Sequence, residues 1–376
     1  MIPGLDGLRA IAFFLVFLCH SSYLEIGWVG VLLFFVLSGF LITTLLINMK
    51  ESLTTKAYFI KFYGRRFLRI FPLYYFYLFL MLGVAYWLYS VGYRQNRMQD
   101  YFNQLPYALT YVYNFYSASA AFKGSSDFTI HLWSLSVEEQ FYIFWPLLIL
   151  FSKKDSYKKL FIAAILIGPL CRIGLSYLFN RHIFEFLGPS PANGIYSMPF
   201  SYIDAFGFGA LITQYRIPKA RLQFVVLLFA IPLIGFVTQY IATGSFGAFT
   251  EFGYPFPLAN GYKQIWGYSL LSYFFAVTIY AVAFDGLFNR FLDLSWMKYL
   301  GKISYGLYVY HYSLIYFAGR IRDVLPVTNE LAKPIIAVLS FAACLLLASL
   351  SFNYLEKPIL SLKEKYFSLH ADPSRG

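Results

Sequence analysis

Apolar runs of about membrane-spanning length recur along the whole of this 376-residue chain. A helix needs roughly 20 apolar residues to cross a bilayer, and no polar stretch between the runs is long enough to build a soluble domain. The sequence therefore predicts an all-α fold, a polytopic transmembrane helical bundle with about ten spans. The predicted spans are Leu5–Tyr23, Gly27–Asn48, Leu68–Tyr89, Leu132–Phe151, Leu160–Leu178, Ile195–Gln214, Phe224–Tyr240, Ile265–Phe284, Gly301–Phe317 and Ile335–Leu355.

Two of these runs are weaker candidates for membrane spans than the rest. Glu138, Glu139 and Gln140 lie near the start of the fourth run, and Asp204 interrupts the sixth. The first run has no basic N-terminal region and no small-residue cleavage site, so we expect it to remain as a span. We expect a transmembrane domain over residues 1–360 and a short cytoplasmic tail over residues 361–376.

Composition and charge agree with a membrane protein. Hydrophobic residues make up 59% of the chain and charged residues only 13%, whereas a soluble protein carries about 25% charged residues. The net charge of +12 would suit a nucleic-acid-binding protein. However, most Lys and Arg residues fall in short connections of one phase of the alternation, which is typical of orientation signals. We therefore expect both termini in the cytoplasm and no nucleic-acid partner.

The chain lacks the short motifs of several enzyme classes. It contains no HExxH, CxxC, Walker or GxSxG motif, which argues against a zinc hydrolase and an ATP-driven pump. Cys19, Cys171 and Cys344 all lie within apolar runs and are expected to be small buried side chains. We therefore predict no metal site.

Arg9 and His20 are ionisable residues within the first apolar run. Ionisable groups at membrane depth are costly, so their presence points to function. Their separation of eleven positions corresponds to a rise of about 16 Å and about three turns, so both side chains can share one face. A neutral imidazole at that depth could act as a general base on a hydroxyl. The alternative is a histidine that only bonds to a neighbouring helix.

Three arginines, Arg65, Arg66 and Arg69, precede the third apolar run. Arg66 and Arg69 are spaced to share one helix face, and guanidinium groups bind phosphate oxygens well. A phosphorylated cytosolic cofactor would suit this cluster. The alternative is anchoring at the membrane surface and binding of anionic lipid head groups.

The segment His131–Tyr142 places Ser134, Glu138 and Tyr142 on one helix face. The carboxylate of Glu138 could orient the His20 ring, balance its charge or bind sugar hydroxyls. The alternative is that this segment only starts a helix, with a serine as N-cap and glutamates that favour the helix dipole. His131, Ser134, Tyr142 and also His311, in the ninth run, are candidate substrate-binding residues.

The second run carries small residues at close spacing, Gly27, Gly30, Ser38 and Gly39. Small residues let two helix backbones approach closely, so this pattern predicts tight helix packing. Ser38 has no base near it in sequence, which argues against a role as nucleophile.

In these motifs the chain resembles the acyltransferase 3 family of integral membrane O-acyltransferases, the O-antigen and exopolysaccharide acetylase type. The resemblance covers nearly the whole chain, in order. The segments that carry it are Leu5–Ala12 with His20, Gly30–Thr43, Tyr63–Pro72, His131–Tyr142, Leu300–Tyr308 with His311, and Glu356–Pro358.

This resemblance implies an enzyme of the bacterial cytoplasmic membrane that moves an acyl group, commonly acetyl, from cytoplasmic acyl-CoA to a hydroxyl of an extracytoplasmic or lipid-linked glycan. By position, Arg9 and His20 would be the essential pair. The arginine cluster would belong to the donor side, and Glu138 and Tyr142 to the acceptor side. Some relatives append a soluble extracytoplasmic domain. This chain is expected to lack one, which leaves open a separate partner protein.

Our hypothesis from the sequence is that His20 deprotonates the sugar hydroxyl while Glu138 orients the imidazole. The alternative mechanism is a covalent relay, in which the acyl group is attached to the histidine before it reaches the sugar. The main rival function is a glycolipid transporter or flippase, against which we find no two-fold repeat and no paired broken helices. A structural membrane subunit is disfavoured by the ionisable residues at depth.

Overall fold

The computed structural model describes residues 2–320 and 329–369, and this part of the chain is helical, with one isolated β-bridge between Ser119 and Leu187 and no strand. The α-helices are α1 (Leu5–His20), α2 (Val29–Ser52), α3 (Thr55–Ser90), α4 (Gln95–Leu109), α5 (Tyr113–Ser117), α6 (Trp133–Phe151), α7 (Tyr157–Asn180), α8 (Pro191–Ser197), α9 (Ile203–Leu211), α10 (Ala220–Thr243), α11 (Lys263–Ala283), α12 (Asn289–Leu292), α13 (Ser295–Lys302), α14 (Ser304–Gly319), α15 (Asn329–Ser351) and α16 (Lys357–Tyr366). Short 3₁₀ turns join several of them, at Glu25–Trp28, Ile130–Leu132, Lys154–Ser156, Pro199–Tyr202, Phe249–Glu251 and Asn260–Tyr262, and a π-helical turn, η8 (Phe352–Glu356), joins α15 to α16.

The described residues contain six helical segments that are long and apolar enough to cross a membrane. They are Glu25–Ser52, Thr55–Ser90, Lys154–Asn180, Ala220–Thr243, Asn260–Ala283 and Leu331–Tyr366. The other four predicted spans correspond to α1, α6, the α8–α9 segment and α14. The all-α prediction is confirmed for the described residues, whereas the total of ten spans stays a prediction.

The sixth predicted span, Ile195–Gln214, is not one helix. It is divided between α8 and α9 by a 3₁₀ turn, Pro199–Tyr202. Proline lacks the backbone N–H that would continue the helix, so the chain breaks at Pro199. The prediction of a continuous helix over this run was therefore wrong.

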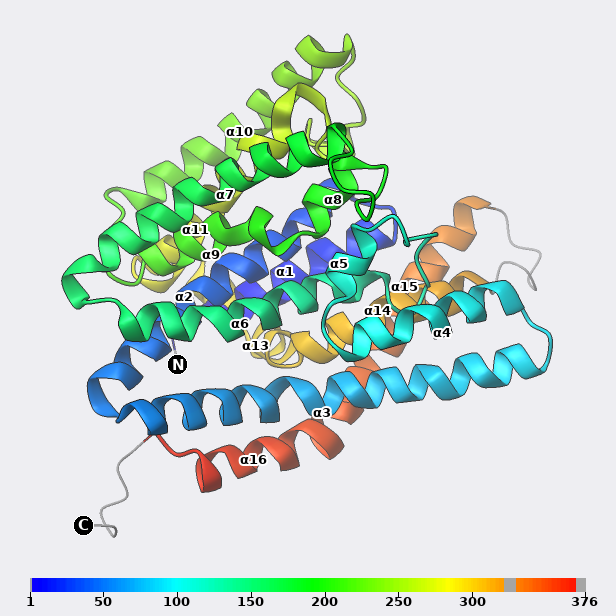
Figure 1. Ribbon diagram of the computed structural model, residues 1–376, viewed down its shortest axis with the longest axis horizontal. Coiled ribbons are helices and arrows are strands. Elements are labelled where there is room, and N and C mark those ends of the chain that lie inside the picture. Colours follow the sequence, from blue (N-terminus) through cyan, green and yellow to red (C-terminus); the bar gives the residue numbers. More distant parts are fainter. Residues whose placement is uncertain (1, 321–328, 370–376) are drawn as a thin grey trace.

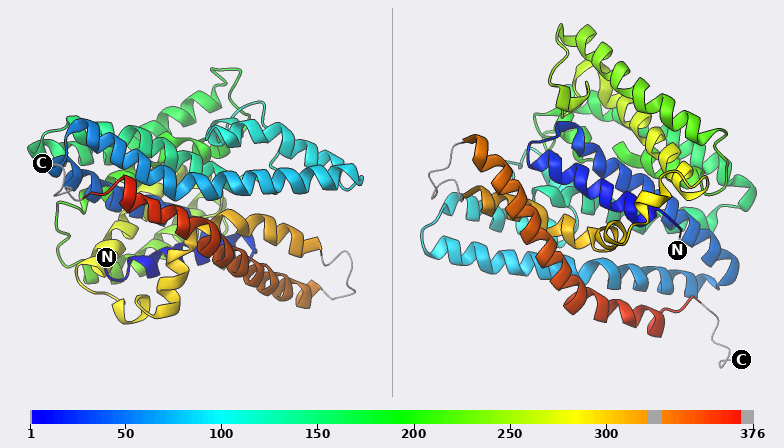
Figure 2. Two further views of the ribbon diagram at one scale, coloured as in Figure 1. Left: turned by 90° about the horizontal axis from the view of Figure 1, so that it is seen from below. Right: turned by 180° about the vertical axis from the view of Figure 1, so that it is seen from behind.

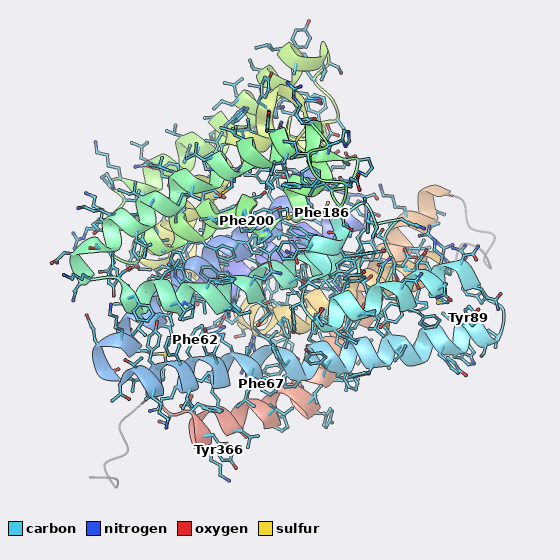
Figure 3. The ribbon with its side chains drawn as sticks, in the orientation of Figure 1. Phe62, Phe67, Tyr89, Phe186, Phe200 and Tyr366 are labelled. Carbon is cyan, nitrogen blue, oxygen red and sulfur yellow. The ribbon has the colours of Figure 1, made fainter. Side chains whose placement is uncertain are left out.

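The helices are arranged in three groups, which Figure 1 shows one above another. The middle group holds α1, α2 and α6, with α1 and α6 both packed on α2. The α7, α9, α10 and α11 helices lie on one side of it, where α9 contacts α2. On the other side lie α3, α4 and α16, with α14 packed on α15. Figure 3 shows Phe62 on the side of α3 that faces α6 and Tyr366 pointing outward from α16.

The first two helices approach closely at Gly27 and Gly30. A β-carbon at either position would collide with a carbonyl oxygen of α1, that of Leu15 or that of Ala12. Only glycine leaves room for this contact between backbones. The predicted close packing of these two glycines is confirmed, and it holds α1, with Arg9 and His20, against α2.

A buried ion pair joins α7 to α9. Arg172 and Asp204 have side-chain exposures of 0% and 1%, and their closest nitrogen and oxygen atoms lie 2.7 Å apart. Arg172 also donates to the Ile265 carbonyl and the Ser269 hydroxyl of α11. Because the guanidinium and carboxylate satisfy each other, these buried charges link three helices and need no ligand.

Helix α1 begins, and helix α16 ends, at the same end of the bundle, as all three views show (Figures 1 and 2). The last turn of α2, the first half of α3 and the α6–α7 connection, which carry many Lys and Arg residues, lie at that end too. This arrangement agrees with the phase of the charge pattern. The cytoplasmic location of that end stays a prediction, and residues 370–376 of the predicted tail lie outside the described residues.

Candidate active site

A cavity of about 440 Å³ lies among α1, α2, α3, α6 and α14. Its walls combine apolar side chains, including Val31, Phe34 and Ile70, with many polar ones. An apolar pocket with a few convergent polar groups is the usual form of a small-molecule site. The polar lining residues are Asp6, Arg9, Ser38, Arg66, Arg69, Ser134, Glu138, Glu139, Tyr142, Ser304, Tyr305 and Tyr308.

Three guanidinium groups, those of Arg9, Arg66 and Arg69, contribute to the cavity wall. Arg9 lies 3.5 Å from the carboxylate of Asp6, one turn earlier on α1. Arg69 lies 3.9 Å from the buried carboxylate of Glu356. The predicted shared face of Arg66 and Arg69 is confirmed, and the three guanidinium groups offer hydrogen-bond donors that suit an anionic ligand.

Arg66 lies over the ring of Tyr142, with its guanidinium carbon 5.4 Å from the ring centre. Such a cation–π contact directs the guanidinium toward the α6 side of the cavity. Its Nε atom is buried and has no hydrogen-bond partner.

Arg65, the neighbour of Arg66, does not line the cavity. Its two terminal nitrogens hydrogen-bond to the carboxylate oxygens of Glu364 at 2.9 and 3.3 Å, and one also donates to the Phe367 carbonyl at 2.8 Å. Arg65 therefore attaches α16 to α3, two helices that run side by side in Figure 1. The structure separates this arginine from the two that follow it.

Glu138 forms a hydrogen-bonded cluster with Ser38 and Tyr142. The Ser38 hydroxyl donates to Oε1 of Glu138 at 2.5 Å, and the Tyr142 hydroxyl donates to the same oxygen. All three side chains line the cavity. Ser134, Glu138 and Tyr142 thus share a face of α6 as predicted, but Glu138 is engaged by α2 and not by His20.

Ser134 and Tyr308 form a second hydrogen-bonded pair in the cavity wall. Their hydroxyl oxygens lie 2.5 Å apart, and each hydroxyl is also 3.1 Å from the carbonyl oxygen of His131. Both residues line the cavity, whereas His20, His131 and His311 do not. The Ser134–Tyr308 pair therefore stands between the cavity and three histidines.

The rings of His20, His131 and His311 form a cluster behind this pair. Nδ1 of His20 lies 2.7 Å from Nε2 of His311, and the two rings stack with centres 5.0 Å apart. The ring of His131 is 5.2 Å from that of His311, and its Nε2 donates to the Val309 carbonyl at 2.9 Å. The side chain of His20 is only partly buried, whereas the other two are buried.

The hydrogen bonds of this cluster assign the tautomers. Nδ1 of His311 lies 2.6 Å from the Tyr308 carbonyl oxygen, which can only accept, so this nitrogen carries the proton. In a neutral ring Nε2 of His311 must then accept a proton from Nδ1 of His20. Nε2 of His20 keeps its lone pair, and a partly exposed imidazole with a free lone pair is the form that a general base requires.

Several residues at this site were not singled out from the sequence. The sequence shows no base near Ser38, and the structure supplies its partner from 100 positions away, at Glu138. Tyr308, Glu139 and Glu356 lay inside recognised motifs without an assigned role. Only the tertiary fold brings these positions together. Within residues 2–320 and 329–369 no group of three or more His, Cys, Asp or Glu side chains could hold a metal ion.

The fold and the site together define a helical integral membrane protein with a polar internal cavity and a histidine cluster next to its wall. The family model described as Acyltransferase domain, that of the acyltransferase 3 family, matches residues 2–353. The chain therefore belongs to this family. The family predicted from the sequence motifs is confirmed.

Curated relatives match nearly the whole chain. O-acetyltransferase OatA of Staphylococcus aureus is 28% identical over 379 residues, which covers 98% of this chain and 58% of the relative. Peptidoglycan O-acetyltransferase OatA of Listeria monocytogenes is 29% identical over 374 residues, with 95% and 56% covered. Putative peptidoglycan O-acetyltransferase YrhL of Bacillus subtilis is 28% identical over 383 residues, with 98% and 56% covered. The chain thus spans little more than half the length of these relatives, and no solved structure matches it.

Proposed function

We propose that this protein is a membrane O-acetyltransferase that moves an acetyl group from acetyl-CoA to a hydroxyl of a cell-envelope glycan. The observation that carries the proposal is the cavity itself, which joins a wall of guanidinium groups to Tyr308, whose carbonyl holds the His311–His20 pair. Two of the relatives are named for peptidoglycan. A peptidoglycan sugar is therefore the acceptor that we propose.

The basic wall of the cavity would bind the phosphates of the donor. Arg9, Arg66 and Arg69 line the cavity, whereas Arg65 is occupied by Glu364, so the first three form the proposed phosphate site. Guanidinium groups bind phosphate oxygens through paired hydrogen bonds. The extended pantetheine arm of CoA is comparable in length to the rise of about 16 Å between Arg9 and His20. The thioester would therefore reach the histidine end of the cavity.

The proposed chemistry uses Nε2 of His20 as the general base. This nitrogen takes the proton of the sugar hydroxyl, and the hydroxyl oxygen forms a bond to the thioester carbonyl carbon. The carbon–sulfur bond then breaks, and the CoA thiolate takes the proton back from the imidazolium. His311 holds the imidazole of His20 in the required tautomer, which is the positioning role that the sequence hypothesis gave to Glu138.

On the proposed route, the thioester would have to pass the Ser134–Tyr308 hydrogen bond. We propose that rotation of the Tyr308 side chain opens this route when the donor binds. The backbone carbonyl of Tyr308 would stay in place, because it belongs to helix α14. The His311–His20 pair would therefore be maintained while the hydroxyl moves.

Purified protein in proteoliposomes with labelled acetyl-CoA and soluble peptidoglycan fragments tests this proposal. We expect release of free CoA that depends on the acceptor, and label in the glycan. A glycolipid transporter would leave the thioester intact, which would end the proposal. A labelled protein adduct formed without acceptor would replace direct transfer by an acyl-histidine relay.

A further inference from the structure

Glu139 has a carboxyl group that lines the cavity and lacks a partner. Its side chain is 9% exposed, its Oε1 atom is buried, and no hydrogen bond or ion pair joins it to a described residue. Its neighbour Glu138 accepts from both Ser38 and Tyr142. A buried carboxyl without a hydrogen-bond partner is costly, and at membrane depth the cost rises further. Such a group indicates that a ligand supplies the missing donor.

The guanidinium group of Arg66 interacts electrostatically with Glu139 but forms no hydrogen bond or ion pair with it in the described part of the chain. The tyrosines around Glu139 do not bond to it either. Tyr74, Tyr75 and Tyr305 interact electrostatically with it, but each donates its hydroxyl to a backbone carbonyl. The hydroxyl of Tyr111 is buried without a partner and does not bond to Glu139. The protein therefore leaves Oε1 of Glu139 free to accept a hydrogen bond from a molecule in the cavity.

The position of Glu139 along the cavity limits which part of a bound molecule can lie next to its carboxyl group. Ser134 contacts the histidine cluster through the His131 carbonyl, and Glu139 follows Ser134 by five residues on α6, a rise of about 7.5 Å. It therefore lies between the histidine end and the guanidinium wall formed by Arg66 and Arg69. In a CoA thioester this stretch is occupied by the pantetheine arm, whose only N–H donors are its two amide groups.

We propose that the carboxyl group of Glu139 accepts a hydrogen bond from an amide N–H of the pantetheine arm, and so selects CoA thioesters as donors. This inference rests on the proposed function. It assigns the recognition of the arm to α6 and leaves the phosphates to Arg9, Arg66 and Arg69.

Binding measurements with two ligands distinguish recognition of the pantetheine arm from recognition of the nucleotide. The ligands are CoA and adenosine 3′,5′-bisphosphate, which lacks the arm, and the proteins are the purified full chain and its E139A, E139Q and E51Q variants. Glu51 is the matched control, because its exposed carboxylate pairs with Lys154 away from the cavity. E139Q keeps the size of the side chain and an acceptor oxygen, which protects the fold.

We expect E139A to weaken CoA binding about tenfold, the effect of losing one hydrogen bond in a buried site. Its affinity for adenosine 3′,5′-bisphosphate should not change, E139Q should recover most of the loss, and E51Q should match the wild type. Equal CoA affinity of E139A and wild type, or a parallel loss for both ligands, would overturn the inference. Failure of the wild type to bind CoA would instead refute the proposed function.

Discussion

Nδ1 of His20 lies 2.7 Å from Nε2 of His311, although the two residues are 291 positions apart. The Tyr308 carbonyl holds the far side of the His311 ring at 2.6 Å, so the chain of hydrogen bonds runs from α14 to α1. This relationship gives His20 a defined tautomer with its Nε2 atom free. In many enzymes a second group likewise forms a hydrogen bond to the catalytic base and holds it in position.

The first prediction concerns His311 as a positioning residue. H311A should lower kcat for acetyl transfer about 100-fold, because His20 loses the partner that orients its ring. The KM for acetyl-CoA should stay close to the wild-type value, since His311 does not line the cavity. Steady-state kinetics checks this split, and a rise in KM at unchanged kcat would contradict it.

Tyr308 offers a matched comparison. Y308F removes the hydroxyl that bonds to Ser134 but keeps the carbonyl that bonds to His311. We expect the kcat of Y308F to stay within about threefold of the wild type, far above that of H311A. A loss in Y308F as large as that in H311A would show that the reaction needs the Tyr308 hydroxyl as well, which would contradict this division of roles.

The arginines at the start of α3 should separate into two classes. R66A and R69A should each raise the KM for acetyl-CoA by at least about tenfold, because a charge-assisted contact to phosphate is lost. R65A should leave this KM unchanged and lower the thermal stability of the protein, because Arg65 attaches α16. If R65A raised KM as strongly as R66A, the proposed phosphate site would be wrong.

The buried ion pair of Arg172 and Asp204 predicts effects on stability that are independent of activity. D204A should destabilise the protein by about 3–5 kcal/mol, because it leaves a buried guanidinium uncompensated. The double variant R172M/D204L should be close to neutral, since both charges are gone. Thermal unfolding of the purified variants in detergent measures both, and similar stabilities for D204A and wild type would contradict the structural role.

Local patterns in the sequence predicted the parts of the site that lie on one helix. Helical spacing was enough for Arg66 with Arg69 on α3, and for Ser134, Glu138 and Tyr142 on α6, because residues three or four apart share a face. The close packing at Gly30 followed from residue size alone. These relationships need no knowledge of which helices are neighbours.

Contacts between distant helices could not be read from the sequence. The Ser38–Glu138 and His20–His311 pairs depend on how α2 meets α6 and how α1 meets α14. Arg65 differs from Arg66 because adjacent residues on a helix point about 100° apart, so one reaches α16 and the other the cavity. The break at Pro199 likewise passed unnoticed within an otherwise apolar run.

Acetyl transfer by the H20A variant decides whether His20 is the catalytic base. The measurement is transfer of label from acetyl-CoA to peptidoglycan fragments by purified wild type and H20A, with the affinity for CoA determined in parallel. If His20 is the base, H20A binds CoA like the wild type and transfers at least about 100-fold more slowly, because the base is gone. Transfer at a near-normal rate by a folded H20A protein would show that another group takes the proton and that the proposed mechanism is wrong.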